Sequence, residues 1–353
     1  MKNIRILQLL LSAALLAGLM PGYSQALRVI NTGGKEITNA IHFPARNTGY
    51  LAGGGGTVLK TADGGETWQS VSDGQKHHYV AVQFFGPQHG YLLTNQGELV
   101  QTTNGGQQWK PVKDTAAVRK SPAATPTGAT GPQTRKDSLG LSKPRPPRHL
   151  ALQANAMHFF NQKEGVVAGN LVSLRDRKQW GVLLKTANGG LTWDTLYRKE
   201  GAVFSAVAFP TRNAGYILSS GGQVLRTGNG GTSWQAVQAV QGHGLRGVYF
   251  LNANTGYVVG GSGKGVLLKT TNGGLTWQPQ PLSSPNFLQT VYFKNEKTGY
   301  VGGGQGSLLK TTDGGTTWTR VATTDREVLK VVFVTDAGKV IAAGSRNKIL
   351  KEK

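Results

Sequence analysis

The sequence has no cysteine among its 353 residues. Disulfides, thiol nucleophiles, thiolate metal ligands and a lipidated N-terminus of the bacterial lipoprotein type are therefore excluded. The histidines do not replace them as metal ligands, because His77 and His78 are neighbours and point to opposite sides of an extended strand. The glycine runs precede strands rather than helices, so no phosphate-binding loop is expected. We predict no metal ion and no cofactor.

Acidic residues are few, with 17 Asp and Glu against 39 Lys and Arg and a formal net charge of +22. This imbalance favours anionic partners, such as acidic protein surfaces, phospholipid headgroups or anionic glycans. A glycosidase needs a pair of carboxyl groups, about 5 Å apart in a retaining enzyme, placed in a substrate cleft. With so few acids, spread over separate segments, no such pair is expected and no catalytic residue is predicted.

Long apolar runs are almost absent, and the run at the N-terminus is too short to span a bilayer. Lys2 and Arg5 precede the apolar residues 6–20, and small residues follow around Ser24 and Ala26. This order is typical of a secretory signal peptide. We expect residues 1–26 to be cleaved and the mature protein to be periplasmic or secreted. Export, together with the lack of a nucleic-acid-binding motif, argues against a nucleic-acid partner.

A repeat dominates the rest of the chain. The octapeptide Thr-x-(Asp/Asn)-Gly-Gly-x-x-Trp, here called the box, occurs six times, and successive box tryptophans are 41, 84, 41, 43 and 41 residues apart. A period near 41 residues is that of a four-stranded propeller blade. The doubled interval contains residues 114–149, which are Pro-rich and basic with the composition of disorder. We interpret them as an inserted loop.

The chemistry of the box explains why it recurs. A short Asp or Asn side chain, such as Asp63 or Asn272, accepts hydrogen bonds from backbone N–H groups just ahead and closes a turn. The Gly-Gly pair supplies the positive φ of a tight hairpin, and the Trp covers the turn and begins the next strand. Because four copies carry Asn and two carry Asp, we predict a structural role for this position.

The same repeat predicts the number of blades. An inner strand is expected to end at a phenylalanine seven times, at Phe43, Phe84, Phe159, Phe209, Phe250, Phe293 and Phe333. Only six boxes are present to begin outer strands, but the β-prone residues 27–30 can complete the seventh blade and remove an open edge. We predict an all-β fold over residues 27–353, a seven-bladed β-propeller of four-stranded antiparallel blades closed by the N-terminal strand.

The box matches the Asp-box, or BNR, repeat of sialidases, some glycoside hydrolases and sortilin-type receptors. The wider unit runs from a Phe-ended strand through Gly-Tyr, a Gly-rich turn and Leu-Leu-Lys-Thr to the box, as between Val291 and Trp318. In this order it resembles the photosystem II assembly and stability factor family of plants and cyanobacteria and its bacterial relatives outside photosynthesis. The resemblance implies binding of an early membrane-protein intermediate during assembly, a role with which a basic arginine patch is associated.

Strand alternation assigns the loops to two faces. The boxes and the turns between first and second strands belong to one face, called lower, and the second-to-third turns and blade crossovers to the other, called upper. On the upper face, the turn of blade three is expected to be enlarged from Asn170 to Trp180. Because exposed loops carry function, and Trp and Arg are enriched at interface hot spots, we predict that the partner-binding residues are Arg175, Arg177, Trp180, Arg198 and Arg246.

A second basic set ends the third strands and is expected to form a rim on the lower face, with Lys60, Lys185, Arg226, Lys269 and Lys310. These side chains either contribute to binding or lie solvated along the outer strands. We therefore expect an exported, monomeric, non-enzymatic protein-binding scaffold or assembly factor. Its partner would be a protein such as a membrane-protein assembly intermediate, or another anionic envelope surface. The alternative is a surface glycan-binding or glycosidase (sialidase-like) propeller.

Overall fold

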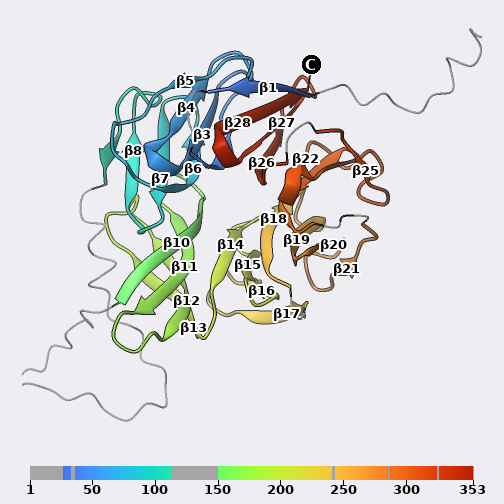
Figure 1. The fold of residues 1–353 in the computed structure, drawn as a ribbon. Helices are drawn as coiled ribbons and strands as arrows, with labels where there is room; N and C mark the ends of the chain where they lie inside the picture. The colour runs from blue at the N-terminus through green and yellow to red at the C-terminus, as the bar shows by residue number, and fades with distance from the viewer. Residues whose placement is uncertain are drawn as a thin grey trace, which may run out of the picture.

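The computed structural model describes residues 27–32, 36–112, 150–240, 243–282, 284, 286–323 and 326–352. These residues form seven four-stranded antiparallel sheets arranged in a ring (Figure 1). The expected signal peptide at 1–26 and the insert at 114–149 lie outside the described residues and stay predictions. In the part of the chain that is described, no helix is long and apolar enough to cross a membrane.

Each of the first six sheets, or blades, consists of four consecutive strands. Blade one contains β2 (Thr38–His42), β3 (Gly49–Gly53), β4 (Val58–Thr61) and β5 (Gln69–Ser70). Blade two contains β6 (Tyr79–Phe85), β7 (His89–Thr94), β8 (Leu99–Thr102) and β9 (Lys110–Pro111). Blade three contains β10 (Leu150–Phe159), β11 (Gly165–Ser173), β12 (Gln179–Thr186) and β13 (Asp194–Glu200).

The next three blades repeat this order. Blade four contains β14 (Phe204–Ala208), β15 (Gly215–Ser219), β16 (Gln223–Thr227) and β17 (Gln235–Ala239). Blade five contains β18 (Leu245–Phe250), β19 (Gly256–Ser262), β20 (Lys264–Thr270) and β21 (Gln278–Pro279). Blade six contains β22 (Leu288–Phe293), β23 (Gly299–Gly303), β24 (Leu308–Thr311) and β25 (Thr319–Arg320).

Blade seven joins the two ends of the described chain. Its strands are β26 (Leu329–Val334), β27 (Val340–Gly344), β28 (Lys348–Glu352) and, outermost, β1 (Leu27–Asn31). β1 runs antiparallel to β28 with Leu27 opposite Glu352, and Figure 1 shows this blue strand beside the red one. The expected seven-bladed all-β propeller, completed by the N-terminal strand, is thus confirmed.

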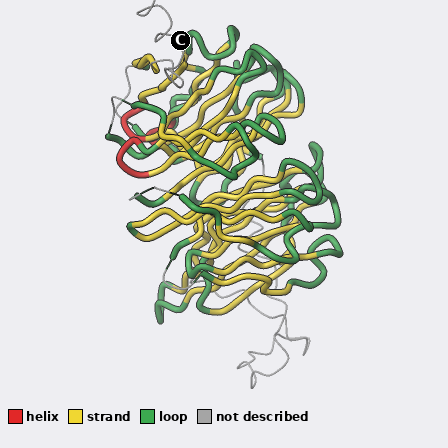
Figure 2. The backbone as a smooth tube through the Cα atoms, turned by 90° about the vertical axis from the view of Figure 1, so that its right-hand side faces the viewer, coloured by secondary structure: helices red, strands yellow, loops and turns green. Residues whose placement is uncertain are grey.

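The expected division of loops between two faces is also present. Three short 3₁₀ turns, η1 (Gly54–Gly56), η3 (Gly304–Gly306) and η4 (Ser345–Asn347), connect second to third strands. They hydrogen-bond to the crossovers between blades, as when the Gly56 N–H donates to the His77 oxygen. The boxes bond instead to the first-to-second turns, as when the Gly64 N–H donates to the Asn47 oxygen. Figure 2 shows the red 3₁₀ turns together on one side of the ring.

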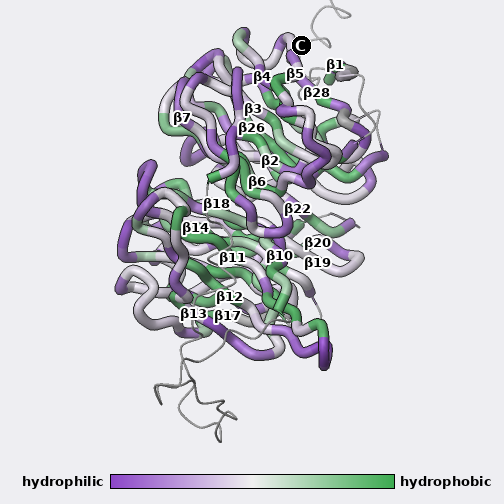
Figure 3. Tube along the Cα trace, turned by 90° about the vertical axis from the view of Figure 1, so that its left-hand side faces the viewer, coloured by the Kyte–Doolittle hydropathy of each residue, from purple (hydrophilic) through white to green (hydrophobic). Residues whose placement is uncertain are grey.

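The core lies between neighbouring blades, where buried apolar residues of adjacent blades form clusters. Figure 3 shows the hydrophobic segments in green along the strands. Six blades pack a phenylalanine ring over a glycine at the first or second position of the second strand. In blade six, a Cβ added at Gly299 would lie 2.5 Å from the Phe293 ring, so only glycine fits there. This contact explains why the repeat contains a glycine before its tyrosine.

The prediction that the inner strand of blade seven ends at Phe333 is wrong by one residue. The inner strand β26 ends at Val334, which pairs with Val340 as Phe293 pairs with Gly299. Phe333 lies one position earlier and stacks on Phe43 of blade one, with ring centroids 4.4 Å apart. Because blade seven has valine instead of the packed phenylalanine, it needs no glycine at the start of its second strand.

The sequence predicted an enlarged loop for the upper turn of blade three. The structure instead has an extended hairpin there. β11 continues to Ser173 and β12 starts at Gln179, with Leu171 opposite Trp180. Only residues 174–178 form the turn between these strands. The first and fourth strands of the blade follow this extension, with Leu150 of β10 opposite Ser173 and Glu200 of β13 opposite Trp180.

Candidate functional site

The acidic or amide position of each box caps the turn, as predicted. In the first box, Asp63 Oδ1 accepts a hydrogen bond from the Thr67 N–H at 2.9 Å. In the fifth box, Asn272 Oδ1 accepts the equivalent bond from the Thr276 N–H at 3.0 Å. The carboxylate oxygen and the amide oxygen accept the same backbone hydrogen bond, as expected for a residue that caps a turn.

In several boxes, the backbone oxygen of the first of the two glycines accepts hydrogen bonds from side chains of the preceding blade. The oxygen of Gly105 in blade two accepts hydrogen bonds from Lys60 Nζ at 2.8 Å and from the Tyr50 hydroxyl at 2.9 Å, both from blade one. We call this arrangement the inter-blade clamp. Other clamps join Tyr216 and Arg226 to Gly273, Tyr257 and Lys269 to Gly314, and, without a tyrosine, Lys351 to Gly64.

Because of the clamps, most residues of the predicted secondary basic rim have a structural role. Lys60, Arg226 and Lys269 are half-buried and bonded inside the ring, so they hold blades together instead of forming a free cationic surface. Lys185 is exposed. Lys310 lies 5.5 Å from the centroid of the Tyr300 ring, the clamp arrangement, but the next blade has no box to receive it because β1 provides its outer strand.

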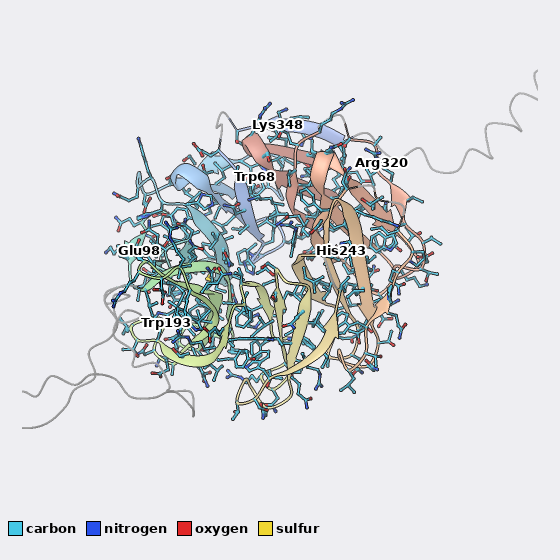
Figure 4. All side chains as sticks on the ribbon, turned by 60° about the horizontal axis from the view of Figure 1, so that its bottom comes forward. Trp68, Glu98, Trp193, His243, Arg320 and Lys348 are labelled. Carbon is cyan, nitrogen blue, oxygen red and sulfur yellow. The ribbon has the colours of Figure 1, made fainter. Side chains whose placement is uncertain are left out.

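The structure brings together two of the five predicted partner-binding residues. The guanidinium carbon of Arg198 lies 4.2 Å from the ring centroid of Trp180, a cation–π contact. Trp180 itself is half-buried against the apolar cluster between blades two and three, and burial lowers the pKa of Arg198. Trp180 therefore has a packing role in its own blade. Figure 4 draws the side chains on the blades and labels the box residues Trp68 and Trp193.

The other three predicted residues are exposed, in two different places. Arg175 and Arg177 lie in the turn at the tip of the blade-three hairpin. Arg246 belongs to β18 of blade five, and its guanidinium carbon lies 5.0 Å from the ring centroid of Phe287. Blade four lies between them in the ring, so the predicted set forms separate groups on one face.

A ring of inner-strand bulges was missed in the sequence. In every blade the innermost strand skips one residue in its pairing, which marks a β-bulge that re-aims a side chain. The skipped residue comes one after the first core residue of the strand, a recurring position that was a readable signal. It is polar in six blades, as Asn39, Asn155, Ser205, Arg246, Gln289 and Lys330, with Val80 in blade two.

The bulged side chains link neighbouring blades where the inner strands begin. Lys330 Nζ of blade seven donates to Asn39 Oδ1 at 2.8 Å, and Asn39 Nδ2 donates to the Tyr79 oxygen at 2.8 Å. Asn39 Nδ2 also lies 3.0 Å from His78 Nε2. Burial lowers the pKa of Lys330, while burial and then the charge of Lys330 lower that of His78. The nearby charge of Glu36 opposes these effects at His78, so basic, neutral and acidic groups meet at this end of the central channel.

Hydrogen bonds lower the pKa of two carboxyl groups, Asp313 and Glu164. The pKa of Asp313 is lowered to about 2 by hydrogen bonds from Thr317 and Thr311. The pKa of Glu164 is lowered by its hydrogen bond from Arg212. A catalytic acid needs a raised pKa. Within the described residues, no three His, Asp or Glu side chains lie close enough together to hold a metal ion.

The repeats and the closed ring define the class of this protein as an Asp-box β-propeller. Its sequence matches the family described as photosynthesis system II assembly factor YCF48 at residues 17–99, 185–285 and 233–343, more than half of the chain. The protein belongs to this family, which confirms the resemblance. A comparison of the sequence with curated proteins returned no match.

Solved structures share the propeller fold of this chain. YCF48 bound to D1 peptide aligns with a TM-score of 0.64 and 18% identity, covering 92% of this chain and 96% of that one. YCF48 from Cyanidioschyzon merolae aligns with 0.66 and 17%, covering 93% and 98%. The GH74 enzyme of Niastella koreensis aligns with 0.65 and 14%, covering 92% and 53%. At such identities the likeness shows the propeller fold alone.

Proposed function

We propose that this protein is an exported, monomeric, non-enzymatic scaffold that binds a protein during the assembly or stabilisation of a membrane complex. Family membership supports an assembly role, and a YCF48 structure bound to D1 peptide supports a protein partner. The observation that carries the proposal is the contrast between faces. Arg175, Arg177 and Arg246 remain exposed on the upper face, whereas three predicted lower-face cations are used within the ring.

The proposed contact surface is the upper face, with the five predicted residues in different roles. Arg175, Arg177 and Arg246 would meet acidic groups of the partner directly. Trp180 and Arg198 would act mainly by fixing the position of the blade-three hairpin through their mutual contact and packing. Long-range attraction between exposed charges is screened beyond about 8 Å at physiological ionic strength, so binding should weaken with added salt.

Two charge-matched variants test this surface. One carries Arg175→Ala, Arg177→Ala and Arg246→Ala, and the other carries Lys185→Ala, Lys310→Ala and Arg320→Ala on the lower side. Partners crosslinked in the envelope fraction would be identified, and the purified partner titrated against both variants and the wild type. We expect at least a tenfold weaker affinity only for the first variant; loss confined to the second would refute the upper-face assignment.

The glycosidase alternative is supported by the GH74 enzymes among the fold neighbours. Against it, the downward carboxyl pKa shifts at Asp313 and Glu164 come from hydrogen bonds that stabilise the ionised forms. We therefore expect no hydrolysis of sialosides or xyloglucan by the purified protein. Export is tested separately by the N-terminal sequence of protein recovered outside the cytoplasm, which should begin at or near residue 27.

A further inference from the structure

The central channel contains a cavity of about 460 Å³ where blades six, seven and one meet. Its wall is made by the inner strands β22, β26 and β2. The volume falls within the range of about 300–1,000 Å³ that is usual for small-molecule sites. None of the five predicted partner-binding residues lines this cavity, so it is separate from the proposed contact surface.

One part of the wall is cationic. Lys330 lines the cavity, and its ammonium group donates to Asn39 Oδ1 at 2.8 Å. None of the ion pairs found in the described part of the chain includes Lys330. A half-buried ammonium without a counter-ion is unfavourable, and an anion in the cavity would relieve that cost.

Another part of the wall is aromatic. Phe333 stacks on Phe43 with ring centroids 4.4 Å apart and planes within 5° of parallel. Tyr292 contacts Phe333 with centroids 4.9 Å apart. Phe333 occupies the position that holds His42, Gln83, His158, Tyr249 or Tyr292 in five other blades and Ala208 in blade four. An aromatic ring without a polar atom stands here only in blade seven.

We propose that this cavity binds a small amphiphilic monoanion, a carboxylate joined to a compact apolar group. The carboxylate accepts hydrogen bonds from Lys330, and the apolar group lies against Phe43 and Phe333. Charge-assisted hydrogen bonds orient such a ligand, and the aromatic surface removes its apolar part from water. This inference does not depend on the proposed scaffold function, because the cavity and the upper-face residues are tested by different variants.

The test uses the full chain and three probes of known chemistry. Benzoate carries both groups, benzamide keeps the ring without the charge, and inorganic phosphate keeps a charge without the ring. Binding would be measured by calorimetry and by shifts of tyrosine and phenylalanine ring signals in NMR spectra. We expect saturable binding of benzoate, at least tenfold weaker binding of benzamide and at least tenfold weaker binding of phosphate. Equal binding of benzoate and either control probe would overturn the proposal, as would no benzoate binding.

Two variants locate the site. Lys330→Met should weaken benzoate binding at least tenfold, and Lys330→Gln serves as a second variant if the first unfolds. Lys264→Met is the matched control, because Lys264 is exposed in the upper hairpin of blade five, away from the cavity. Wild-type benzoate affinity in a folded Lys330 variant, or an equal loss in Lys264→Met, would overturn the assignment.

Discussion

Within the boxes, Asp and Asn are interchangeable because the neighbouring hydroxyl group adapts to either. Asp313 Oδ2 accepts a hydrogen bond from the Thr317 hydroxyl at 2.6 Å. In the fifth box, Asn272 Nδ2 donates to Thr276 Oγ1 at 2.9 Å, so the hydroxyl has changed from donor to acceptor. We expect Asp313→Asn to leave the melting temperature at neutral pH nearly unchanged.

At low pH, the thermal stability of the wild type and that of Asp313→Asn should differ. Because hydrogen bonds lower the folded-state pKa of Asp313 from 3.8 to about 2, its ionised form stabilises the fold above about pH 4. That contribution is lost as the pH falls through about 2, and Asn has none to lose. Thermal melts at pH 4, 3 and 2 should therefore show a smaller decline for Asp313→Asn than for wild type. Parallel declines would contradict the cap assignment.

The inter-blade clamps predict unequal effects of similar lysine substitutions. Lys269 Nζ donates to the Gly314 oxygen at 2.6 Å, whereas Lys310 has the same place in its blade without a box to bond. Losing a charge-assisted hydrogen bond at a half-buried carbonyl should cost about 1–2 kcal/mol in Lys269→Met. Lys310→Met should cost less than about 0.5 kcal/mol. Urea unfolding of both variants measures this difference, and an equal or reversed order would exclude the clamp as a stabilising contact.

At the scale of the strands, a glutamine side chain joins blades two and three. Gln83 Nε2 donates to the Phe159 oxygen at 2.7 Å, and Gln83 Oε1 accepts from the Phe159 N–H at 2.9 Å. The side-chain amide thus pairs with the end of β10 as another strand would. We expect Gln83→Leu to lower the free energy of unfolding by about 1–3 kcal/mol, because both groups of Phe159 lose their partner.

The matched control for this contact is Gln289→Leu. Gln289 is also half-buried on an inner strand, but at the bulge position and without such a pair of bonds to a neighbouring backbone. Chemical denaturation of both variants should show the larger loss for Gln83→Leu. A loss as large in Gln289→Leu would mean that any polar residue on these strands is equally important.

The ring as a whole was predictable because its determinants are local and repeated. The box spacing gives the blades, and the β-prone residues 27–30 give the closing strand. Contacts between blades were not predictable, since Lys60 and Gly105 are 45 residues apart in the sequence and meet only through the packing of blades one and two. The same holds for Trp180, whose packing comes from blade three rather than from a box. The misassigned Phe333 follows from a local exception, where two valines replace the usual Phe and Gly.

One acidic side chain of the first box connects blade one to blade seven. Glu66 of blade one pairs with three cations of blade seven: Arg28 of β1, Lys351 of β28 at 2.6 Å and Lys339 at 4.0 Å. The side chain of Lys351 is only 2% exposed, so its charge depends on this partner and on the Gly64 carbonyl. We expect Glu66→Gln to lower the free energy of unfolding by about 1.5–3 kcal/mol.

The control is Glu296→Gln, an exposed acid in the lower turn of blade six, which should change the free energy of unfolding by less than about 0.5 kcal/mol.

Removing β1 by deletion of residues 27–31 should have a larger effect than Glu66→Gln, because β28 would become an open edge and the chain would aggregate. If β1 closes the ring through Glu66, Arg28→Ala and Glu66→Gln should be non-additive in a double-mutant cycle. Additive effects, with an unchanged melting temperature after the deletion, would show that the ring is stable without β1 and the Glu66 ion pairs.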